Sequence, residues 1–285
     1  MGTDGGPRDW EATTYDRVST PHRAWGADVL GRLDLRGDER ALDAGCGTGR
    51  VTAELRRLLP DGHVIGVDGS PSMIAQAERV LPRDVELQVQ DLTALVLDAP
   101  VDVIVSTATF HWIADHAALF RRLAGALVAG GRLEAQCGGA GNIASVATAI
   151  GRLREREPWA SSFLGWEDDW NFAGPEETAA RLAGAGFVDV ACALEPRSVP
   201  VEDPNAYLRT VVLGSYLERL PEEAQDDFVE AVRAELDTGE GVTLDYVRLN
   251  LSAVRGDDGA PESVTAPGGA VAESAEDIAA RLRRL

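Results

Sequence analysis

The chain has 285 residues, 45% of them hydrophobic, which is enough apolar material for one large globular domain or two small ones. Its 27 basic residues are all arginines, and with 47 acidic residues they give a formal net charge of −20. This balance argues against a nucleic-acid partner, because phosphate binding needs a basic surface. The lack of lysine excludes Schiff-base chemistry and a Walker-type phosphate lysine.

The three cysteines, Cys46, Cys137 and Cys192, are odd in number, far apart and without the spacing of metal ligands. They predict neither a disulfide framework nor a metal site, and a reducing, cytoplasmic location is the simplest expectation. The sequence shows no basic segment leading into an apolar core, and no window of about 18 consecutive apolar residues. We therefore expect no membrane association.

Residues 1–9 are rich in Gly and Asp, and we expect them to be disordered. From 10 to 35, aromatic and aliphatic residues recur at helical spacing, which predicts a helix. Two interpretations stay open. This helix only covers a sheet, or Tyr15 and either His22 or Arg23 also close over the amino-acid end of a bound cofactor.

The most informative stretch is residues 41–50, Ala-Leu-Asp-Ala-Gly-Cys-Gly-Thr-Gly-Arg. A strand containing Asp43 passes into three alternate glycines and then into a predicted helix over 51–59. Such glycines let the backbone adopt positive φ and bring a ligand against the main chain. The G-x-G-x-G spacing puts Arg50 where a dinucleotide fold has its third glycine. The Asp43 carboxylate before the turn would repel a pyrophosphate but could accept hydrogen bonds from a cationic amino group. The turn therefore favours a nucleoside that carries an amino acid.

The next strand also ends at an acid. Residues 63–68 form a buried run ending at Asp68, 19 residues after Gly49, where a carboxylate is placed to accept both ribose hydroxyls. The alternative is that Asp68 caps the helix predicted over 72–81. Ser70, followed by Pro71, suits the cap better, which leaves Asp68 for the ribose.

Residues 85–92 alternate as a strand and bring a third acid, Asp91, to its end. Residues 101–106 form another buried strand, and Phe-His-Trp at 110–112 follows its carboxyl end. We expect a helix from 115 or 116 to about 127, ended by the two glycines at 130 and 131, and then a strand over 132–136. Strands that alternate with helices imply a largely parallel sheet with ligands at its carboxyl edge.

The second half of the chain is less specific. A helix is predicted over 142–154, and the aromatic loop after it either forms a satellite core or walls an apolar pocket. The aromatic residues of this loop are Trp159, Phe163, Trp166, Trp170 and Phe172. The elements expected beyond it are a helix over 175–186, a strand over 187–194, two helices within 202–237 separated by Pro221, and a long strand over 243–253. Residues 256–285 are expected to be disordered.

The motif D-x-G-C-G-T-G at 43–49 resembles motif I of the class I S-adenosylmethionine-dependent methyltransferases. The runs Gly-Val-Asp-Gly-Ser-Pro-Ser-Met at 66–73 and Phe-His-Trp-Ile-Ala-Asp-His at 110–116 resemble the trans-aconitate and juvenile-hormone-acid methyltransferase type. The resemblance covers residues 10–255 and implies one domain with an α/β, Rossmann-like fold. Its seven-stranded, mostly parallel sheet would have an antiparallel last strand, and a helical cap would come from 10–35, 140–175 and 202–240.

The resemblance also implies the site. S-adenosylmethionine would be the cofactor, S-adenosylhomocysteine the product, and a small molecule the acceptor, with no metal. The carboxylate of Asp91 would accept the adenine amino group, unless it only begins a turn, while the Leu92 N–H would reach an adenine ring nitrogen. The residues implied around the cofactor are Tyr15, His22, Arg23, Asp43, Ala44, Gly45, Cys46, Gly47, Asp68, Gly69, Met73, Gln90, Asp91, Leu92, Ser106 and Thr107.

His111 and Trp112 are the candidate catalytic residues. A Gln commonly precedes the Trp in the trans-aconitate type, so His111 departs from that pattern. A carboxylate acceptor is ionised at neutral pH and needs no base, and the Trp112 indole N–H would then bind one of its oxygens. A phenol, amine or carbon acid needs a base, for which His111 is placed, although it can also be a polar wall residue.

We expect O-methylation of an apolar organic acid or specialised metabolite. N-, C- or phenol O-methylation with His111 as the base, and a non-catalytic module that only binds S-adenosylmethionine, stay as alternatives. A nicotinamide oxidoreductase is disfavoured by Asp43 and by the shortened glycine pattern.

Overall fold

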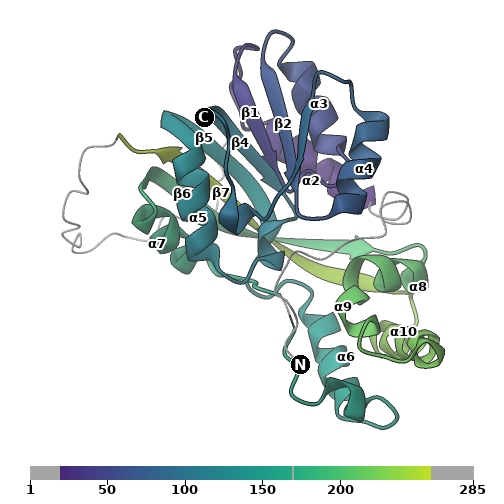
Figure 1. Cartoon of the computed structure of the whole chain (residues 1–285). Helices are drawn as coiled ribbons and strands as arrows, with labels where there is room; N and C mark the ends of the chain where they lie inside the picture. The colour runs from purple at the N-terminus through teal and green to yellow at the C-terminus, as the bar shows by residue number, and fades with distance from the viewer. Residues whose placement is uncertain (1–19, 169, 258–285) are drawn as a thin grey trace, which may run out of the picture.

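The computed structural model describes residues 20–168 and 170–257. Its centre is a seven-stranded sheet with the order β3-β2-β1-β4-β5-β7-β6 (Figure 1). Strands β1 to β5 pair in parallel, whereas β7 runs antiparallel to both of its neighbours. The predicted Rossmann-like sheet with an antiparallel last strand is confirmed. The strands are β1 (Arg40–Ala44), β2 (His63–Asp68), β3 (Glu86–Val89), β4 (Val101–Thr107), β5 (Leu127–Gly138), β6 (Phe187–Pro200) and β7 (Thr243–Arg255).

Helices cover both faces of the sheet and one of its ends (Figure 1). The longer helices are α2 (Thr20–Leu30), α3 (Arg50–Leu58), α4 (Pro71–Val80), α5 (His116–Ala126), α6 (Ala144–Arg154), α7 (Pro175–Gly184) and α10 (Glu222–Leu236). The short helical segments are η1 (Leu92–Ala94), η2 (Phe110–Trp112), η3 (Ala160–Phe163), α8 (Pro204–Tyr207), the π-helical η4 (Leu208–Val212) and α9 (Gly214–Leu217).

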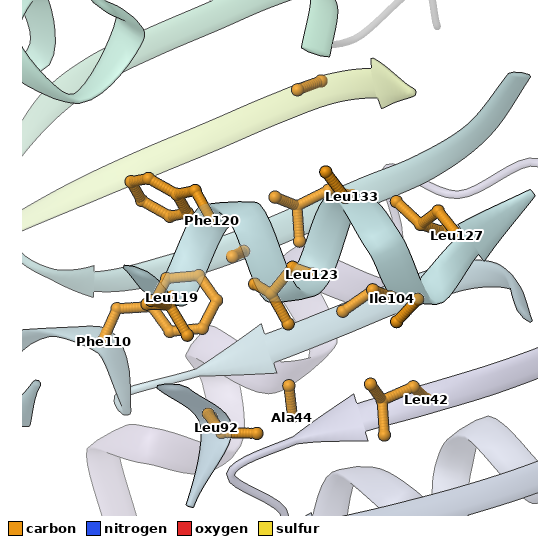
Figure 2. Close-up of a cluster of buried hydrophobic side chains, with 14 of the residues drawn as sticks. Leu42, Ala44, Leu92, Ile104, Phe110, Leu119, Phe120, Leu123, Leu127 and Leu133 are labelled. Carbon is orange, nitrogen blue, oxygen red and sulfur yellow. The ribbon is translucent and has the colours of Figure 1, made fainter. Parts of the chain in front are cut away.

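Alternate residues of the central strands feed two separate cores, because successive side chains of a strand point to opposite faces. Figure 2 shows Leu119 and Leu123 of α5 packed over Leu42 of β1 and Ile104 of β4. The neighbouring strand residues, such as Ala41, belong to the other core, which lies beneath α2, α3 and α4. Burial on both faces explains why these strands are continuous apolar runs in the sequence.

The helical cap is built on an extension of β7. Residues 248–254 of β7 pair with β5, whereas 243–247 pair only with β6 and project beyond the carboxyl end of β5. The cap helices α6, α8, α9 and α10 gather around this extension (Figure 1). Two polar contacts tie them to it: the Tyr207 and Tyr246 hydroxyls are 2.7 Å apart, and the Ser145 hydroxyl donates to Asp245. The limits predicted for the domain, 10 and 255, stay predictions.

Several predicted boundaries are wrong for local physical reasons. Helix α5 ends at Ala126, before the glycines at 130 and 131, because Leu127 already pairs with Val101 and the glycines fall inside β5. Strand β3 stops at Val89. Of the two helices predicted within 202–237, the second is the single helix α10 after Pro221, whereas the first is divided into α8, the π-helical η4 and α9. The disorder predicted for 1–9, and for all but the first two residues of 256–285, concerns residues outside the described ranges.

Within residues 20–168 and 170–257, the longest and most apolar helices still fall short of what a bilayer crossing needs. No group of three or more His, Cys, Asp or Glu side chains in these ranges is arranged to hold a metal ion.

A row of buried polar side chains lies across β5 and β7, on the face opposite α5. The Ser252 hydroxyl donates to Glu134 Oε1 at 2.5 Å, and Gln136 Nε2 donates to Asn250 Oδ1 at 2.8 Å. The Arg32 guanidinium, which follows α2, also donates to Asn250 Oδ1. Glu134 Oε2 is buried without a hydrogen bond to the described part of the chain. This row therefore contains an acid whose ionised form is poorly solvated.

Burial raises the pKa of Glu134 to about 7 from 4.5, against the opposing effects of the Ser252 bond and the charges of Arg32 and Arg132. Between about pH 4.5 and 7, Glu134 is therefore protonated in the folded protein but ionised in the unfolded chain. The protonated carboxyl contributes its full stability below about pH 4.5, and this stability is lost as the pH rises through about 7. We expect Glu134→Gln to abolish this loss, which is at most about 3 kcal/mol.

The measurement is urea unfolding of both proteins at about pH 5 and about pH 7.5. The wild type should lose more free energy of unfolding between the two pH values than the variant. If wild type and Glu134→Gln lost the same free energy of unfolding between the two pH values, Glu134 would not hold a proton in the folded protein.

Candidate functional site

The turn between β1 and α3 is made by three glycines with positive φ: 84° at Gly45, 54° at Gly47 and 88° at Gly49. A Cβ at Gly45 would lie 2.1 Å from Thr109 Oγ1, and one at Gly49 would lie 2.6 Å from Leu81 Cδ1. A Cβ at Gly47 would meet no atom of the described residues within 4 Å. The outer glycines are therefore required by close packing, whereas no described residue fills the space above Gly47, so a ligand could approach the main chain there.

Asp68, at the end of β2, holds this turn in place. Its Oδ2 accepts the Gly47 N–H at 2.8 Å, and its Oδ1 accepts the Ser70 N–H at 2.9 Å. Ser70 Oγ accepts the Met73 N–H at 3.2 Å, so Ser70 caps α4 as predicted. Each carboxylate oxygen of Asp68 thus accepts one backbone bond, and the predicted contact of Asp68 with the ribose hydroxyls stays a prediction.

Asp43 lies behind the turn and is fully buried. Its Oδ2 accepts the Thr52 hydroxyl of α3 at 2.7 Å, while its Oδ1 has no hydrogen bond within the described chain. Burial, with a smaller contribution from the charge of Asp68, raises the pKa of Asp43 to about 7. The direct contact predicted between Asp43 and a cofactor amino group stays a prediction, and Oδ1 is the atom that it would use.

Asp91 and Leu92 follow β3 at the same edge of the sheet. Asp91 Oδ1 accepts both the N–H and the hydroxyl of Thr93 at 2.8 Å, which caps η1. The predicted turn role is therefore confirmed. Asp91 Oδ2 makes no hydrogen bond to the described residues, and the predicted contact of Asp91 with an adenine amino group stays a prediction. Leu92 is buried in the core beneath α5.

The side chains of two predicted cofactor residues, Ser106 and Gln90, form hydrogen bonds with the protein's own backbone. The Ser106 hydroxyl donates to the Ala44 carbonyl at 2.6 Å and joins β4 to β1, and the Gln90 amide exchanges two hydrogen bonds with the Val96 backbone. Tyr15 lies outside the described residues, as do the side chains of His22 and Arg23. The other predicted residues lie at the carboxyl ends of β1, β2 and β4 or in the first turn of α4: Ala44, Cys46, Gly69, Met73 and Thr107.

His111 and Trp112 lie in η2, directly after β4. His111 is 7% exposed, and its Nδ1 accepts the N–H of Gly138 at 3.2 Å. This bond assigns the proton of the neutral ring to Nε2, because Nδ1 must present a lone pair. The ring stacks on Phe172 with centroids 5.7 Å apart, and Trp112 meets Trp170 edge to face at 6.4 Å. At neutral charge, His111 is thus a hydrogen-bond donor at Nε2.

Asn171 and His116 fix the backbone on both sides of His111. The Asn171 N–H donates to the His111 carbonyl at 2.9 Å, and its Nδ2 donates to the Ala114 carbonyl at 2.9 Å. His116 Nε2 donates to the Phe110 carbonyl at 2.8 Å, and burial lowers the pKa of His116, which keeps its ring neutral. Sequence analysis missed Asn171, since a single Asn among aromatic residues carries no periodic signal.

The aromatic loop forms a satellite core in its first part, where Phe163 is 4% exposed and packs on Phe228. Its second part faces η2, and Trp170 stacks on Phe172 at 5.4 Å beside His111. The side chains packed next to His111 and Trp112 are therefore aromatic, and the alternative that the loop walls an apolar pocket stays a prediction.

Comparisons with known proteins agree with this geometry. A family model described as a methyltransferase domain matches residues 41–131. A trans-aconitate 2-methyltransferase of Azoarcus sp. (strain BH72) is 30% identical over 267 residues, which cover 86% of this chain and 99% of the relative. The trans-aconitate 2-methyltransferase of Methylobacterium nodulans is 36% identical over 128 residues, 45% of this chain. That match spans only about half of the relative, 49%.

Among solved structures, phosphoethanolamine N-methyltransferase 2 of Haemonchus contortus, in complex with phosphomonomethylethanolamine and S-adenosylhomocysteine, has a similar fold, with a TM-score of 0.55. It is 19% identical, and the match covers 82% of this chain and 53% of that chain. At this identity the likeness concerns the fold alone.

The tautomer of His111 is testable without any ligand. Nitrogen-15 NMR of the neutral imidazole should show the proton on Nε2 and an unprotonated Nδ1, because the Gly138 N–H occupies Nδ1. The resonance is assigned by its loss in His111→Gln. A neutral ring protonated at Nδ1 would rule out the Gly138 bond.

Proposed function

The chain belongs to the S-adenosylmethionine-dependent methyltransferases, in the family that includes trans-aconitate 2-methyltransferases, and on that premise we propose that it methylates a carboxylate oxygen of a small organic acid. The observation that carries the choice of acceptor is the bond from the Gly138 N–H to His111 Nδ1. It makes His111 a donor at Nε2, which suits an anionic acceptor that needs no base.

The cofactor seat in this proposal is the edge of β1, β2 and β3. No described residue fills the space over Gly47, which would let the cofactor lie against the main chain, and the Asp68 carboxylate at the end of β2 would accept the ribose hydroxyls. The Oδ2 atom of Asp91, which is not used by η1, suits an adenine amino group. When bound, S-adenosylmethionine supplies a methyl group already activated by the positive sulfonium.

The protein then has to align the acceptor and keep water away. His111 Nε2 and the Trp112 indole N–H would each hold one carboxylate oxygen, which orients the carboxylate for an in-line displacement. Alignment of this kind is worth on the order of 7 to 11 kcal/mol. Phe172 and Trp170 would pack on the rest of the acceptor, which suits an apolar acid, and Asn171 and His116 keep the η2 backbone in place for this contact.

His111 as a general base is the less favoured reading, because a base needs a lone pair at the nitrogen that faces the substrate. The proposal is tested by S-adenosylhomocysteine release with trans-aconitate, trans-cinnamate and octanoate, compared with a phenol and an amine of similar size. Methylation of the phenol or the amine but not of any acid would overturn it. A cytoplasmic location belongs to the same proposal, since Cys46, Cys137 and Cys192 are all free thiols.

We expect Asp68→Ala to weaken S-adenosylhomocysteine binding by about 1.5 to 3 kcal/mol, the range for hydrogen bonds to a charged group. The measurement is titration calorimetry. Asp102→Ala is the matched control, because the Asp102 carboxylate also accepts a backbone N–H, from Arg40 at 2.9 Å, but at the opposite end of the sheet. Equal affinities for the Asp68 variant and the wild type would remove Asp68 from the site.

A second prediction separates donation from base catalysis. His111→Gln keeps an N–H donor and should leave kcat/KM for an acid within about threefold, whereas His111→Ala should lower it about tenfold or more. For an acid, kcat of the wild type at saturating S-adenosylmethionine should not rise with pH between about 6 and 8, because the acceptor is already ionised. If His111 were instead a general base, His111→Gln would be inactive, and the wild-type rate would rise with pH through the range in which an imidazole titrates.

A further inference from the structure

Thr109 lies between the two halves of the site, because it follows β4 closely and directly precedes η2. We propose that Thr109 is a positioning residue. Its side chain is fixed on the glycine turn of the cofactor seat, its backbone carries the segment with His111 and Trp112, and it thereby sets the separation between methyl donor and acceptor. This inference rests on the proposed function above and adds to it a residue that the sequence patterns did not indicate.

The side chain of Thr109 is not used in the way that its position predicts. A threonine directly before a helix usually caps it by accepting a backbone N–H of the first turn. Thr109 stands at this position before η2, but its side chain makes no capping hydrogen bond. Its hydroxyl instead donates backwards, to the carbonyl oxygens of Thr107 at 3.0 Å and of Gly45 at 3.3 Å. The hydroxyl is therefore directed at the turn after β1 and not at the helix that it precedes.

The rest of the Thr109 side chain packs on the same turn. A Cβ at Gly45 would lie 2.3 Å from Thr109 Cγ2 and 2.6 Å from Thr109 Cβ, so the threonine occupies the place of a side chain at 45. Gly45 is also fixed from the side of β2, because its N–H donates to the Val67 carbonyl at 2.7 Å. The start of the glycine turn is thus held between β2 and Thr109.

The backbone around Thr109 explains how one residue reaches both halves of the site. The Ala108 N–H still donates to the Gln136 carbonyl of β5 at 2.7 Å, but Ala108 has a φ of 55°, a value that residues with a side chain rarely adopt. The chain turns sharply there and brings Thr109 back over Gly45. The Thr109 carbonyl then accepts the Trp112 N–H at 3.0 Å and begins η2. Strained backbone of this kind persists where surrounding contacts hold it, and it is frequent at active sites.

The consequence for catalysis is a rigid link between donor and acceptor. In the proposed function the cofactor lies on the turn at Gly47, and η2 holds the acceptor. A misplacement of about 1 Å between reacting groups can cost about 100-fold in rate. Any play at Thr109 changes the distance across which the methyl group moves, while the binding surfaces on either side stay intact. The effect should therefore appear in kcat and not in the affinity for either ligand.

The rival account is that Thr109 only stabilises the fold. It predicts a lower free energy of unfolding for Thr109→Ala, with a normal kcat for the molecules that stay folded. Thr148 is the matched control, because its hydroxyl also donates to a backbone carbonyl, that of Ala144 at 2.8 Å, but within the cap helix α6.

The experiment measures kcat per folded molecule, KM for the acceptor and Kd for S-adenosylhomocysteine. The acceptor is whichever acid of the panel above the wild type methylates, or the phenol or amine if only that compound is methylated. Thr109→Ala should lower kcat about tenfold or more, while KM and Kd stay within about threefold of wild type. Thr109→Ser keeps the hydroxyl and should recover most of the rate, and Thr148→Ala should match the wild type in all three constants.

A second measurement needs no turnover. The nitrogen-15 resonances of His111 should show one neutral tautomer in wild type and in Thr109→Ser. In Thr109→Ala they should show a mixture of tautomers, because η2 is no longer fixed on the turn and the bond from the Gly138 N–H to His111 Nδ1 is loosened.

Three kinetic outcomes would overturn the assignment: a kcat of Thr109→Ala within about threefold of wild type, a rise in KM or Kd as large as the fall in kcat, and an equal fall in kcat for Thr148→Ala. If the wild type methylates no compound of the panel, an unchanged His111 spectrum in Thr109→Ala overturns it. The two proposals fail separately. Methylation of the phenol or the amine alone contradicts the proposed function, and kcat of Thr109→Ala with that compound still decides the role of Thr109.

Discussion

The site depends on one hydrogen bond across two strands, from the Gly47 N–H to the Asp68 carboxylate. Positive φ at three alternate glycines is costly to maintain in a free loop, because glycine loses more conformational freedom on folding than any other residue. Asp68 offsets this cost by tying the turn to the end of β2, and Thr109 closes the turn from the side of β4. Three strand ends are thereby held in one fixed arrangement around an open space.

The proposed acceptor half of the site is organised around Gly138, the last residue of β5. The Gly138 N–H donates to His111 Nδ1, and the Phe172 ring occupies the space that a side chain at position 138 would need. One glycine at the end of a strand thus fixes the protonated nitrogen of the imidazole and the position of the ring that stacks on it.

Most of the fold and the predicted cofactor half of the site could be predicted from the sequence, because they depend on patterns within short stretches of the chain. The boundaries of β2 were predicted to the residue, and the cap formed by Ser70 was predicted from Ser-Pro at the start of α4. The acceptor half was predicted only as far as His111 and Trp112. The contacts of Gly138 with His111 and Phe172 join separate segments of the chain, and no local pattern reports such contacts. The burial of Asp43 was missed for a different reason: it depends on how the next helix, α3, packs on the end of β1.

The long ladder between β6 and β7 has a mechanical consequence. It continues without a break from the sheet into the cap, from the pair of Phe187 with Arg255 to the pair of Pro200 with Thr243, apart from one irregularity near Val188. A hinge between cap and sheet would have to bend this ladder, so the paired strands oppose opening of the cap as a rigid body. The segments outside the ladder can repack without disturbing it, which makes them the easier route for ligands to enter and leave.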